Sequence, residues 1–411
     1  MRVFREREGK MTKQQTTAPV SLRDIEDARK RIAPHLFKTP LSFSHGLSAR
    51  FNRDVYIKWD NKLRTGSFKE RGALNFLLRL SDEQRKQGVC AASAGNHALA
   101  VAWHCKKLGI PCTIVMPTTA PLVKIKTSSN FGAEVQLVGK ILGESYEFAQ
   151  ELSRKQKKIF VPGYDHVDVV AGAGVSGLEI LEDLPDFDSI VVPIGGGGLI
   201  AGIARALKES NHPAKIFGVR STWTKGPGYT SPFSPSPIAD GIAVKEIGGV
   251  PAEIIETDVD EILYVEEQII ASAVTLYLYE ERTVIEGAGS ASLATLMADM
   301  IPANFKKTVL LACGSNIDLN ILARLIQRSQ FQQGQLVRLR VSVPDRPGSL
   351  MQLTKCISDQ HANVLETFHE RSFSREPGNV EITFLLEIRD LKHKQSVFES
   401  LSALDLNPME V

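Results

Sequence analysis

Short apolar runs alternate with helix-like stretches from residue 55 to residue 312 of this sequence. The apolar runs cover residues 55–58, 89–92, 112–116, 134–138, 189–194, 215–219 and 308–312. Such alternation of strands and helices favours parallel sheets that carry helices on both faces. The runs are continuously apolar rather than alternating, which fits strands buried on both sides. The fold class predicted for this part of the chain is therefore α/β.

The pattern changes near residue 330. The polar stretch 329–335 is predicted to be a linker, and strand-like segments with alternating polarity follow it, LVRLRVSV and NVEITFLLEI. A helix-like stretch at 349–360 lies between them. This rhythm predicts a small α+β module of order βαββαβ over residues 336–411.

The two ends of the first region have different characters. Residues 1–20 are polar and lack the apolar core of a signal peptide, so we expect a disordered segment. Ser21 and Asp24 then form a capping signature ahead of a helix that ends near Leu36.

Composition limits the class of protein. A chain of 411 residues with 43% hydrophobic and 23% charged residues is typical of a globular protein with two or three domains. The net charge of +2 gives no field that would attract nucleic acid or an anionic membrane, so neither partner is expected. No apolar run reaches about 18 residues, which argues against a spanning helix. The five cysteines form no C-x-x-C pair, which favours reduced thiols and a cytoplasmic location.

A run of four glycines follows one apolar strand. The segment PIGGGGL at 193–199 precedes a helix predicted at 200–209. Consecutive glycines let backbone N–H groups converge on an anion, and a helix N-terminus adds a favourable dipole. No lysine of a nucleotide-binding loop follows, and the spacing is not G-x-G-x-x-G. A phosphate site is favoured over a simple tight turn.

Three other segments carry candidate chemistry. Ser93-Ala-Gly-Asn-His97 joins a strand to a helix and suits a carboxylate or phenolate oxygen, although an ordinary helix cap would read the same. Cys313 ends an apolar strand, where it is either a small buried residue or faces a ligand at the carboxyl edge of the sheet. Lys69 lies in TGSFKERGA, where a solvated lysine is the simplest alternative.

Taken in this order, SFKERGA, SAGNH, GGGGL and CGSN resemble the β-elimination family of pyridoxal-phosphate enzymes of fold type II, and most of all the threonine ammonia-lyases. MPTTAPLVKIKTSSNFGAEVQLVG, SPIADGIAV and VIEGAGSASLATL extend the resemblance over residues 22–328. It implies a catalytic domain at 21–328 with two parallel-sheet subdomains, the smaller inserted at about 60–160. VPDRPGSL and ANVL make the C-terminal module similar to an ACT domain, a regulatory module that senses amino acids.

The resemblance also implies roles for individual residues. Lys69 would form the Schiff base with pyridoxal 5'-phosphate, and Phe68 would pack on the pyridine ring. Asn96 would hydrogen-bond the ring hydroxyl, and Cys313 would meet the ring nitrogen. The remaining cofactor contacts would come from Gly195, Gly196, Gly197, Gly198, Leu199 and Gly241. The substrate carboxylate would lie against Ser93, Ala94, Gly95 and His97.

The implied reaction is deamination of L-threonine to 2-oxobutanoate and ammonia, with L-serine to pyruvate as a side activity. Lys69 would act as general base. A neutral Cys313 thiol makes the cofactor a weaker electron sink, which favours prompt loss of the β-hydroxyl. Whether this serves isoleucine biosynthesis or degradation is left open.

Departures from the family pattern keep alternatives in view: a serine racemase, a hydroxyaspartate dehydratase, or an amino-acid-sensing relative without turnover. Ala94 stands where related racemases have a serine that transfers a proton, which argues for elimination. Arg220 replaces a glutamate that can help bind a divalent cation, so no metal is expected there; a pairing of Arg220 with an acidic group elsewhere would also remove it. The unusual segments 171–175 and 222–237 leave the substrate side chain open.

The ACT-like module has two readings. As a regulator, it would bind an amino-acid effector beside Asp345, Arg346, Gly348 and Asn363 at an interface between modules. As a structural element, it would only join subunits. Both readings imply a homodimer or homotetramer, because such modules pair their sheets.

Overall fold

The computed structural model describes residues 19–226, 236–371 and 377–411. Residues 1–18 and most of the segment 222–237 therefore lie outside the description. The chain divides into two compact units, Met1–Ile317 and Asp318–Val411. The sequence instead favours a boundary near residue 328, and the predicted domain limits remain a prediction.

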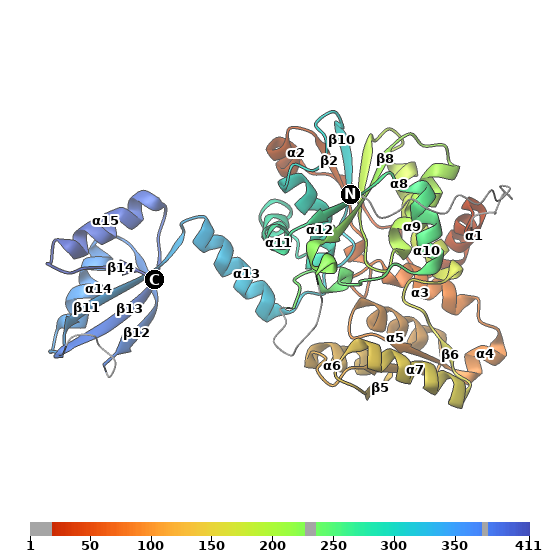
Figure 1. Cartoon of the computed structure of the whole chain (residues 1–411), viewed down its shortest axis with the longest axis horizontal. Helices are drawn as coiled ribbons and strands as arrows, with labels where there is room; N and C mark the ends of the chain where they lie inside the picture. Colours follow the sequence, from red (N-terminus) through yellow and green to blue (C-terminus); the bar gives the residue numbers. More distant parts are fainter. Residues whose placement is uncertain (1–18, 227–235, 372–376) are drawn as a thin grey trace, which may run out of the picture. The chain divides into compact units, whose positions relative to one another are not determined.

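The first unit contains two sheets of parallel strands, drawn in Figure 1. The larger sheet has the order β1-β2-β10-β7-β8-β9, and only β1 runs antiparallel to its neighbour. Its strands are β1 Leu41–Phe43, β2 Asp54–Lys58, β7 Ser189–Pro193, β8 Lys215–Ser221, β9 Glu261–Val265 and β10 Lys307–Leu311. The smaller sheet has the order β5-β4-β3-β6. Its strands are β3 Val89–Ala92, β4 Cys112–Met116, β5 Glu134–Leu137 and β6 Ile159–Phe160.

This arrangement confirms the α/β prediction of two parallel-sheet subdomains. All seven apolar runs form strands, and β7 and β4 are buried at every position. The sequence reading missed β1, β6 and β9. β1 and β6 are only two or three residues long, and β9 was overlooked although residues 262–265 form a short apolar run.

Helices cover both faces of the sheets. The helices of the first unit are α1 Leu22–Ile32, α2 His45–Phe51, α3 Lys69–Leu78, α4 Asp82–Gln87, α5 Asn96–Leu108, α6 Leu122–Asn130, α7 Leu142–Gln156, α8 Val167–Asp183, α9 Gly198–Glu209, α10 Gly249–Asp258, α11 Glu267–Glu281 and α12 Gly287–Met297. Three short 3-10 turns complete the unit: η1 Asp60–Lys62, η2 Thr222–Lys225 and η3 Asp240–Ile242. Ser21 and Asp24 form the expected capping box at α1.

Close packing of α8 on α9 depends on glycine. A Cβ on Gly202 would overlap the carbonyl oxygen of Val170 and the backbone of Gly174. The absence of side chains at both positions brings the two helix backbones together. Helix α9, which starts at the glycine run, is thereby fixed against the core.

The second unit begins with α13 Leu319–Gln332, so part of the predicted linker 329–335 is helical. The remaining elements are β11 Leu336–Pro344, α14 Ser349–Asp359, β12 Asn363–Glu370, β13 Asn379–Glu387, α15 Leu391–Ser402 and β14 Met409–Glu410. The sheet order is β12-β13-β11-β14, with every neighbouring pair antiparallel. The predicted βαββαβ order is confirmed.

Candidate active site

Lys69 is the first residue of α3 and is half-buried. Its Nζ donates to the carbonyl of Gly163 at 2.7 Å and lies 5.0 Å from the ring centroid of Phe68. Burial lowers the pKa of Lys69 to about 8, against the opposing influence of Cys313 and Glu286. A useful fraction of the amine is therefore neutral near pH 7, as a nucleophile or base requires. The alternative of a solvated lysine is wrong.

The loop before α3 is tied to the end of β10. The N–H of Phe68 donates to the carbonyl of Cys313 at 3.0 Å, and Ser67 forms an isolated bridge with Gly314. Parallel strands end at a common edge, so Lys69 and Cys313 meet there although they are far apart in sequence. Burial raises the pKa of the Cys313 thiol well above its usual value, and Glu286 adds to this. The thiol is neutral.

Four charged side chains form a buried ion cluster behind Lys69: Lys58, Asp60, Arg71 and Glu179. Arg71 reaches Asp60 at 2.8 Å and Glu179 at 2.7 Å, and Lys58 reaches Glu179 at 2.6 Å. Two cations and two anions balance, so the cluster carries no net formal charge. Because Arg71 lies one helical half-turn after Lys69, the cluster fixes the first turn of α3.

The glycine run lies between β7 and α9. Gly197 has a φ of 94°, which disfavours side chains, and a Cβ on Gly196 would overlap the ring of Tyr164. The carbonyls of Gly196 and Gly197 accept bonds from Gly248 and Ala201. Among the described residues, the N–H groups of the loop at 195–197 have no acceptor. The carbonyls thus face the protein, and the amides are left for an anion.

Gly241 and Leu199 also lie at this edge. Gly241 belongs to η3, and its carbonyl oxygen would lie 3.0 Å from a Cβ on Gly195. Leu199 is buried in the first turn of α9. A small cavity is lined by Phe68, Lys69, Gly72, Gly163, Tyr164, Val169, Ala173 and Gly198. Sequence reasoning did not single out Tyr164, which contacts both the lysine and the glycine run.

The SAGNH segment ends β3 and starts α5. A Cβ on Gly95 would meet no atom within 4 Å, so the helix N-terminus is open at this point. His97 is buried, and its Nε2 lies 3.0 Å from the carbonyl oxygen of Val161. Burial and the charge of Lys69 lower the pKa of His97 to about 4. Ser93 accepts a bond from the N–H of Gly95, and Ala94 offers only a methyl group.

Asn96 is joined to two residues that the sequence analysis did not select. Its Nδ2 donates to Oε1 of Glu286 at 2.6 Å, and its Oδ1 accepts from Nδ2 of Asn316 at 2.7 Å. Burial, reinforced by Asp240, raises the pKa of Glu286 to about 7. Both residues lie within segments that the sequence analysis quoted, VIEGAGSASLATL and CGSN. No local pattern distinguishes either residue, because the burial of Glu286 and its contact with Asn96 arise only in the folded chain.

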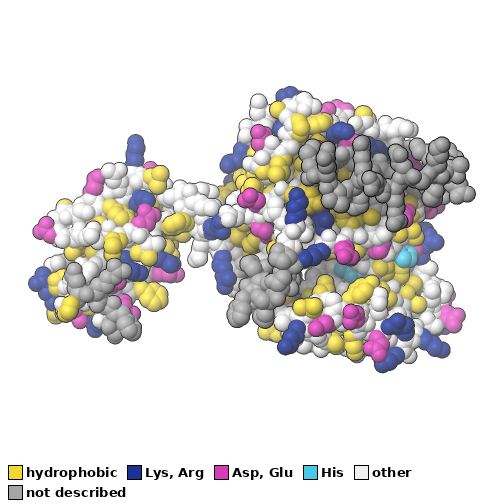
Figure 2. All heavy atoms as spheres, in the orientation of Figure 1, with side chains coloured by type: hydrophobic (Ala, Val, Ile, Leu, Met, Phe, Trp, Pro, Cys, Tyr) yellow, Lys and Arg dark blue, Asp and Glu magenta, His cyan; other side chains and the backbone are white. Residues whose placement is uncertain are grey.

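Two lobes of the first unit face each other across a hollow visible in Figure 2. Lys124 of α6 pairs with Asp240 of η3 at 3.3 Å and links the lobes.

Arg220 is buried and donates to the carbonyls of Val244 and Lys245. The alternative that Arg220 pairs with an acidic group is not found among the described residues. Within the described ranges, no group of three or more His, Cys, Asp or Glu side chains could hold a metal ion.

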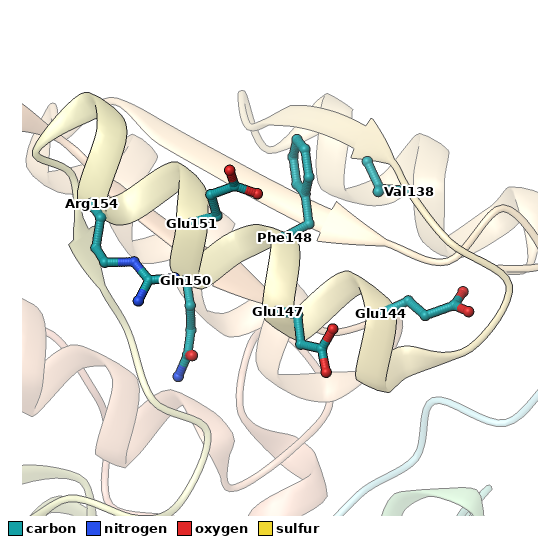
Figure 3. Close-up of a pocket in the computed structure, with 7 residues that line it drawn as sticks. All are labelled: Val138, Glu144, Glu147, Phe148, Gln150, Glu151 and Arg154. Atoms are coloured by element: carbon teal, nitrogen blue, oxygen red, sulfur yellow. The ribbon is translucent and has the colours of Figure 1, made fainter.

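Figure 3 shows a second concavity, over α7. It is lined by Val138, Glu144, Glu147, Phe148, Gln150, Glu151 and Arg154. Glu151 pairs with Lys155, and Glu144 accepts from the backbone N–H of Lys140. None of the predicted site residues borders it. We interpret it as a solvated helix face.

The predicted effector residues in the second unit are exposed but separated. Asp345, Arg346 and Gly348 follow β11, next to the start of β13, whereas Asn363 pairs with Glu387 at the end of β13. Eight residue steps along a strand span about 26 Å. One amino acid cannot contact both groups within a single module, so a shared site would require two copies.

No helix in the described ranges is long and apolar enough to cross a membrane.

Residues 32–314 match the family described as pyridoxal-phosphate dependent enzyme, and residues 332–405 match the ACT domain. The L-threonine ammonia-lyase of Thermotoga maritima is 40% identical over 393 residues, which cover 93% of this chain and 98% of that protein.

Two solved structures are similar to the chain over its first three quarters. The processed form of threonine deaminase isoform 2 from Solanum lycopersicum has a TM-score of 0.68 and 32% identity, covering 75% of this chain and 87% of its own. A pyridoxal 5'-phosphate-dependent aspartate racemase also has a TM-score of 0.68 and 32% identity, covering 74% of this chain and 98% of its own. Similar structures thus belong to a protein named as a threonine deaminase and to one named as an aspartate racemase.

Proposed function

Because the chain belongs to the pyridoxal-phosphate-dependent enzyme family and carries a C-terminal ACT domain, we propose that it deaminates L-threonine to 2-oxobutanoate and ammonia by α,β-elimination. The observation that carries this proposal is Lys69, a half-buried amine with a pKa of about 8, next to Cys313 at the carboxyl edge of the sheet. The likeness to an L-threonine ammonia-lyase along both units supports threonine as the substrate.

The residues present fit pyridoxal phosphate. The glycine run offers amides without acceptors for the phosphate, and Phe68 offers an apolar ring surface beside Lys69. When bound, the cofactor supplies an electron sink for the negative charge that develops at the substrate α-carbon. The neutral thiol of Cys313 would meet the ring nitrogen without adding negative charge.

The chain's own groups account for binding and proton transfer. The open N-terminus of α5 at Gly95 and Asn96 would hold the substrate carboxylate, because helix N-termini favour anions. His97 is neutral near pH 7, so it would orient the site through its bond to Val161 rather than supply a charge. Nζ of Lys69, in its neutral form, would accept the α-proton.

Racemisation is a second candidate because an aspartate racemase has a similar structure. A racemase needs a proton donor on the face of the substrate opposite to Lys69. Ala94, at the position expected for that donor, carries only a methyl group, and a methyl group cannot transfer a proton. Elimination is therefore favoured, with L-serine as a second substrate.

The second unit is an ACT domain, which indicates an amino-acid effector. We infer that the effector binds between two modules, because the candidate residues Asp345 and Asn363 lie at opposite ends of β13 in each one. The active form is then a homodimer or homotetramer.

The five cysteines are free thiols, which supports a cytoplasmic location.

The test is 2-oxo acid release by the purified full chain with pyridoxal phosphate. L-threonine, L-serine and threo-3-hydroxyaspartate are compared, with and without EDTA. We expect fast release of 2-oxobutanoate from threonine, at a rate that EDTA does not change. This result would also support the prediction that no metal ion binds near Arg220. The Lys69→Ala variant should be inactive, and the exposed-residue variant Lys62→Ala should match the wild type. Absence of turnover with all three substrates would contradict the proposal and favour a sensing protein.

A further inference from the structure

The amide of Asn96 belongs to a closed ring of hydrogen bonds. Nδ2 of Asn316 donates to the carbonyl of Thr65 and to Oδ1 of Asn96, both at 2.7 Å. Nδ2 of Asn96 donates to Oε1 of Glu286 at 2.6 Å, and the backbone N–H of Asn316 donates to Oε2 of the same carboxylate at 3.0 Å. Segments far apart in the sequence thus meet around one side chain.

The ring permits only one orientation of each amide. A backbone carbonyl can only accept, so Thr65 requires the nitrogen of the Asn316 side chain to face it. Both N–H groups of that nitrogen are then used, and the second can only meet an oxygen. The oxygen of Asn96 must therefore face Asn316, and its nitrogen must face Glu286.

One N–H group of the Asn96 side chain is left without an acceptor by these hydrogen bonds. The amide nitrogen has two N–H groups, and Glu286 takes one of them. The other has no acceptor among the described residues. Asn96 thus offers a hydrogen-bond donor to a ligand at the start of α5 and cannot turn to offer an acceptor. A ligand oxygen with negative charge, such as a phenolate, matches this donor.

Glu286 is itself held in place by packing. It precedes α12 as its N-cap, where a carboxylate is favoured by the helix dipole. Its backbone N–H donates to the carbonyl of Gly314 at 3.0 Å. A Cβ on Gly314 would overlap the Glu286 carboxylate, so glycine at this position leaves the room that the ring needs.

We propose that Glu286 and Asn316 are positioning residues that lock the Asn96 amide, so that its remaining N–H is donated to the phenolic oxygen of the cofactor. This inference rests on the proposed function, since that function supplies the cofactor. Neither residue needs to touch the cofactor. Their effect passes through Asn96, whose orientation determines whether the cofactor oxygen is bound as a phenolate or as a phenol.

The decisive variant is Asn316→Asp, which keeps the size of the side chain but replaces the donor by a carboxylate. The carboxylate would face the oxygens of Thr65 and Asn96, and this repulsion would turn the Asn96 amide around. The Asn96 oxygen would then face Glu286 at the position where the nitrogen donates in the wild type, so the Glu286 carboxyl, whose pKa is raised to about 7, would carry a proton and donate to it. An oxygen would then face the cofactor and accept a proton from its hydroxyl. The absorption of the bound cofactor should shift from the visible phenolate band toward the near-ultraviolet phenol band. Loss of a bond to a charged oxygen should also weaken pyridoxal phosphate binding by about tenfold or more.

Glu286→Gln provides a second variant, should Asn316→Asp fail to fold. An amide can accept at only one of the two positions, so a smaller shift in the same direction is expected. Ser315→Ala is the matched control, because Ser315 lies in the same loop and its side-chain hydroxyl donates only a 3.3 Å bond to the carbonyl of Gly66. Its spectrum should equal that of the wild type. Thermal unfolding of all variants without cofactor shows which of them are folded.

The outcomes separate this inference from the function on which it rests. If the wild type binds the cofactor at Lys69 and both folded ring variants keep its spectrum and affinity, the inference is overturned and the proposed function stands. If the wild type itself captures no cofactor, both are overturned. A spectral shift in the two ring variants but not in Ser315→Ala supports the inference, whatever happens to turnover.

Discussion

Single residues at the site differ most from what their type alone would suggest. Lys69 and His97 are both basic side chains, but burial lowers the pKa of the first to about 8 and of the second to about 4. His97 is therefore almost entirely neutral near pH 7, and Lys69 is neutral in a much larger fraction than an ordinary lysine. A shift of this kind in a cleft is typical of functional groups, because the protein rather than water sets the cost of charge.

The pKa of Lys69 gives a prediction at this scale. Roughly a tenth of these amines are neutral at pH 7 with a pKa of about 8, against a few in ten thousand for an ordinary lysine. Because the neutral amine is the nucleophile, the rate of covalent capture of pyridoxal phosphate by the cofactor-free chain should rise with pH and level off above about pH 8. Stopped-flow absorbance measures this rate. A rise that continues beyond pH 10 would contradict the assigned pKa, and Lys69→Ala should show no capture.

At the scale of elements, α3 and the glycine run fix the site in different ways. The start of α3 is held by the buried ion cluster, which lies behind Lys69 and away from water. The glycine run is held by the absence of side chains, which lets Tyr164 and Gly241 come close to its backbone. Charge compensation fixes one element, and close contact fixes the other.

Removing Arg71 from the buried ion cluster should destabilise the folded protein. Arg71→Gln leaves the buried carboxylates of Asp60 and Glu179 with only Lys58, so the free energy of unfolding should fall by about 3 to 5 kcal/mol. Chemical or thermal unfolding of the full chain measures the change. Arg79→Gln is the matched control at the other end of α3, where the arginine of the pair with Asp168 is exposed, and this pair should contribute about 1 kcal/mol or less. Equal effects of the two variants would contradict the cluster's role.

A methyl group in the glycine run should weaken cofactor binding. Gly196→Ala places a Cβ within the ring of Tyr164, so the ring or the loop must move, and the affinity for pyridoxal phosphate should fall about tenfold or more. Cofactor titration followed by absorbance gives the affinity. Gly249→Ala serves as control, since its Cβ would meet only Asp165 at 3.9 Å. An unchanged affinity of Gly196→Ala would show that the run does not hold the phosphate.

At the scale of the whole molecule, the chain joins a catalytic unit to an ACT domain. Each unit has its own core: the first has sheets covered by helices, and the core of the second lies between one antiparallel sheet and the helices α14 and α15. In the proposed regulation, effector binding would favour one conformational state of the protein over another.

The separation of Asp345 from Asn363 gives a prediction at this scale. If one effector spans two copies, Asp345→Ala and Asn363→Ala should each weaken amino-acid binding by about tenfold, although the residues lie far apart within one module. Calorimetry of the full chain with a panel of amino acids measures binding, and light scattering should show that the effector favours the larger oligomer. Glu399→Gln, on the exposed side of α15, should bind normally. Loss of binding in only one of the first two variants would place the site within a single module.

Part of the site follows from sequence and part does not. Asn96, the glycine run and Cys313 could be selected because each lies just after a strand that its own apolar residues define, whereas Lys69 was selected through the resemblance of SFKERGA to the family. Glu286 and Asn316 could not, because their importance comes from the contacts they make with Asn96 and Thr65. The same holds for Tyr164, whose ring fills the space that Gly196 leaves.

The sequence alone determined the two kinds of sheet and the order of their main strands, because burial on one or both faces leaves a local pattern of apolar residues. It also selected the segments of the proposed site, through the resemblance of their short motifs to the family, since glycines and capping residues act within a few positions along the chain. Only the tertiary structure decided the pKa values of Lys69 and His97, the balance of the buried ion cluster and the orientation of the Asn96 amide. These depend on charges and hydrogen bonds between residues that are distant in sequence, and no local pattern records them.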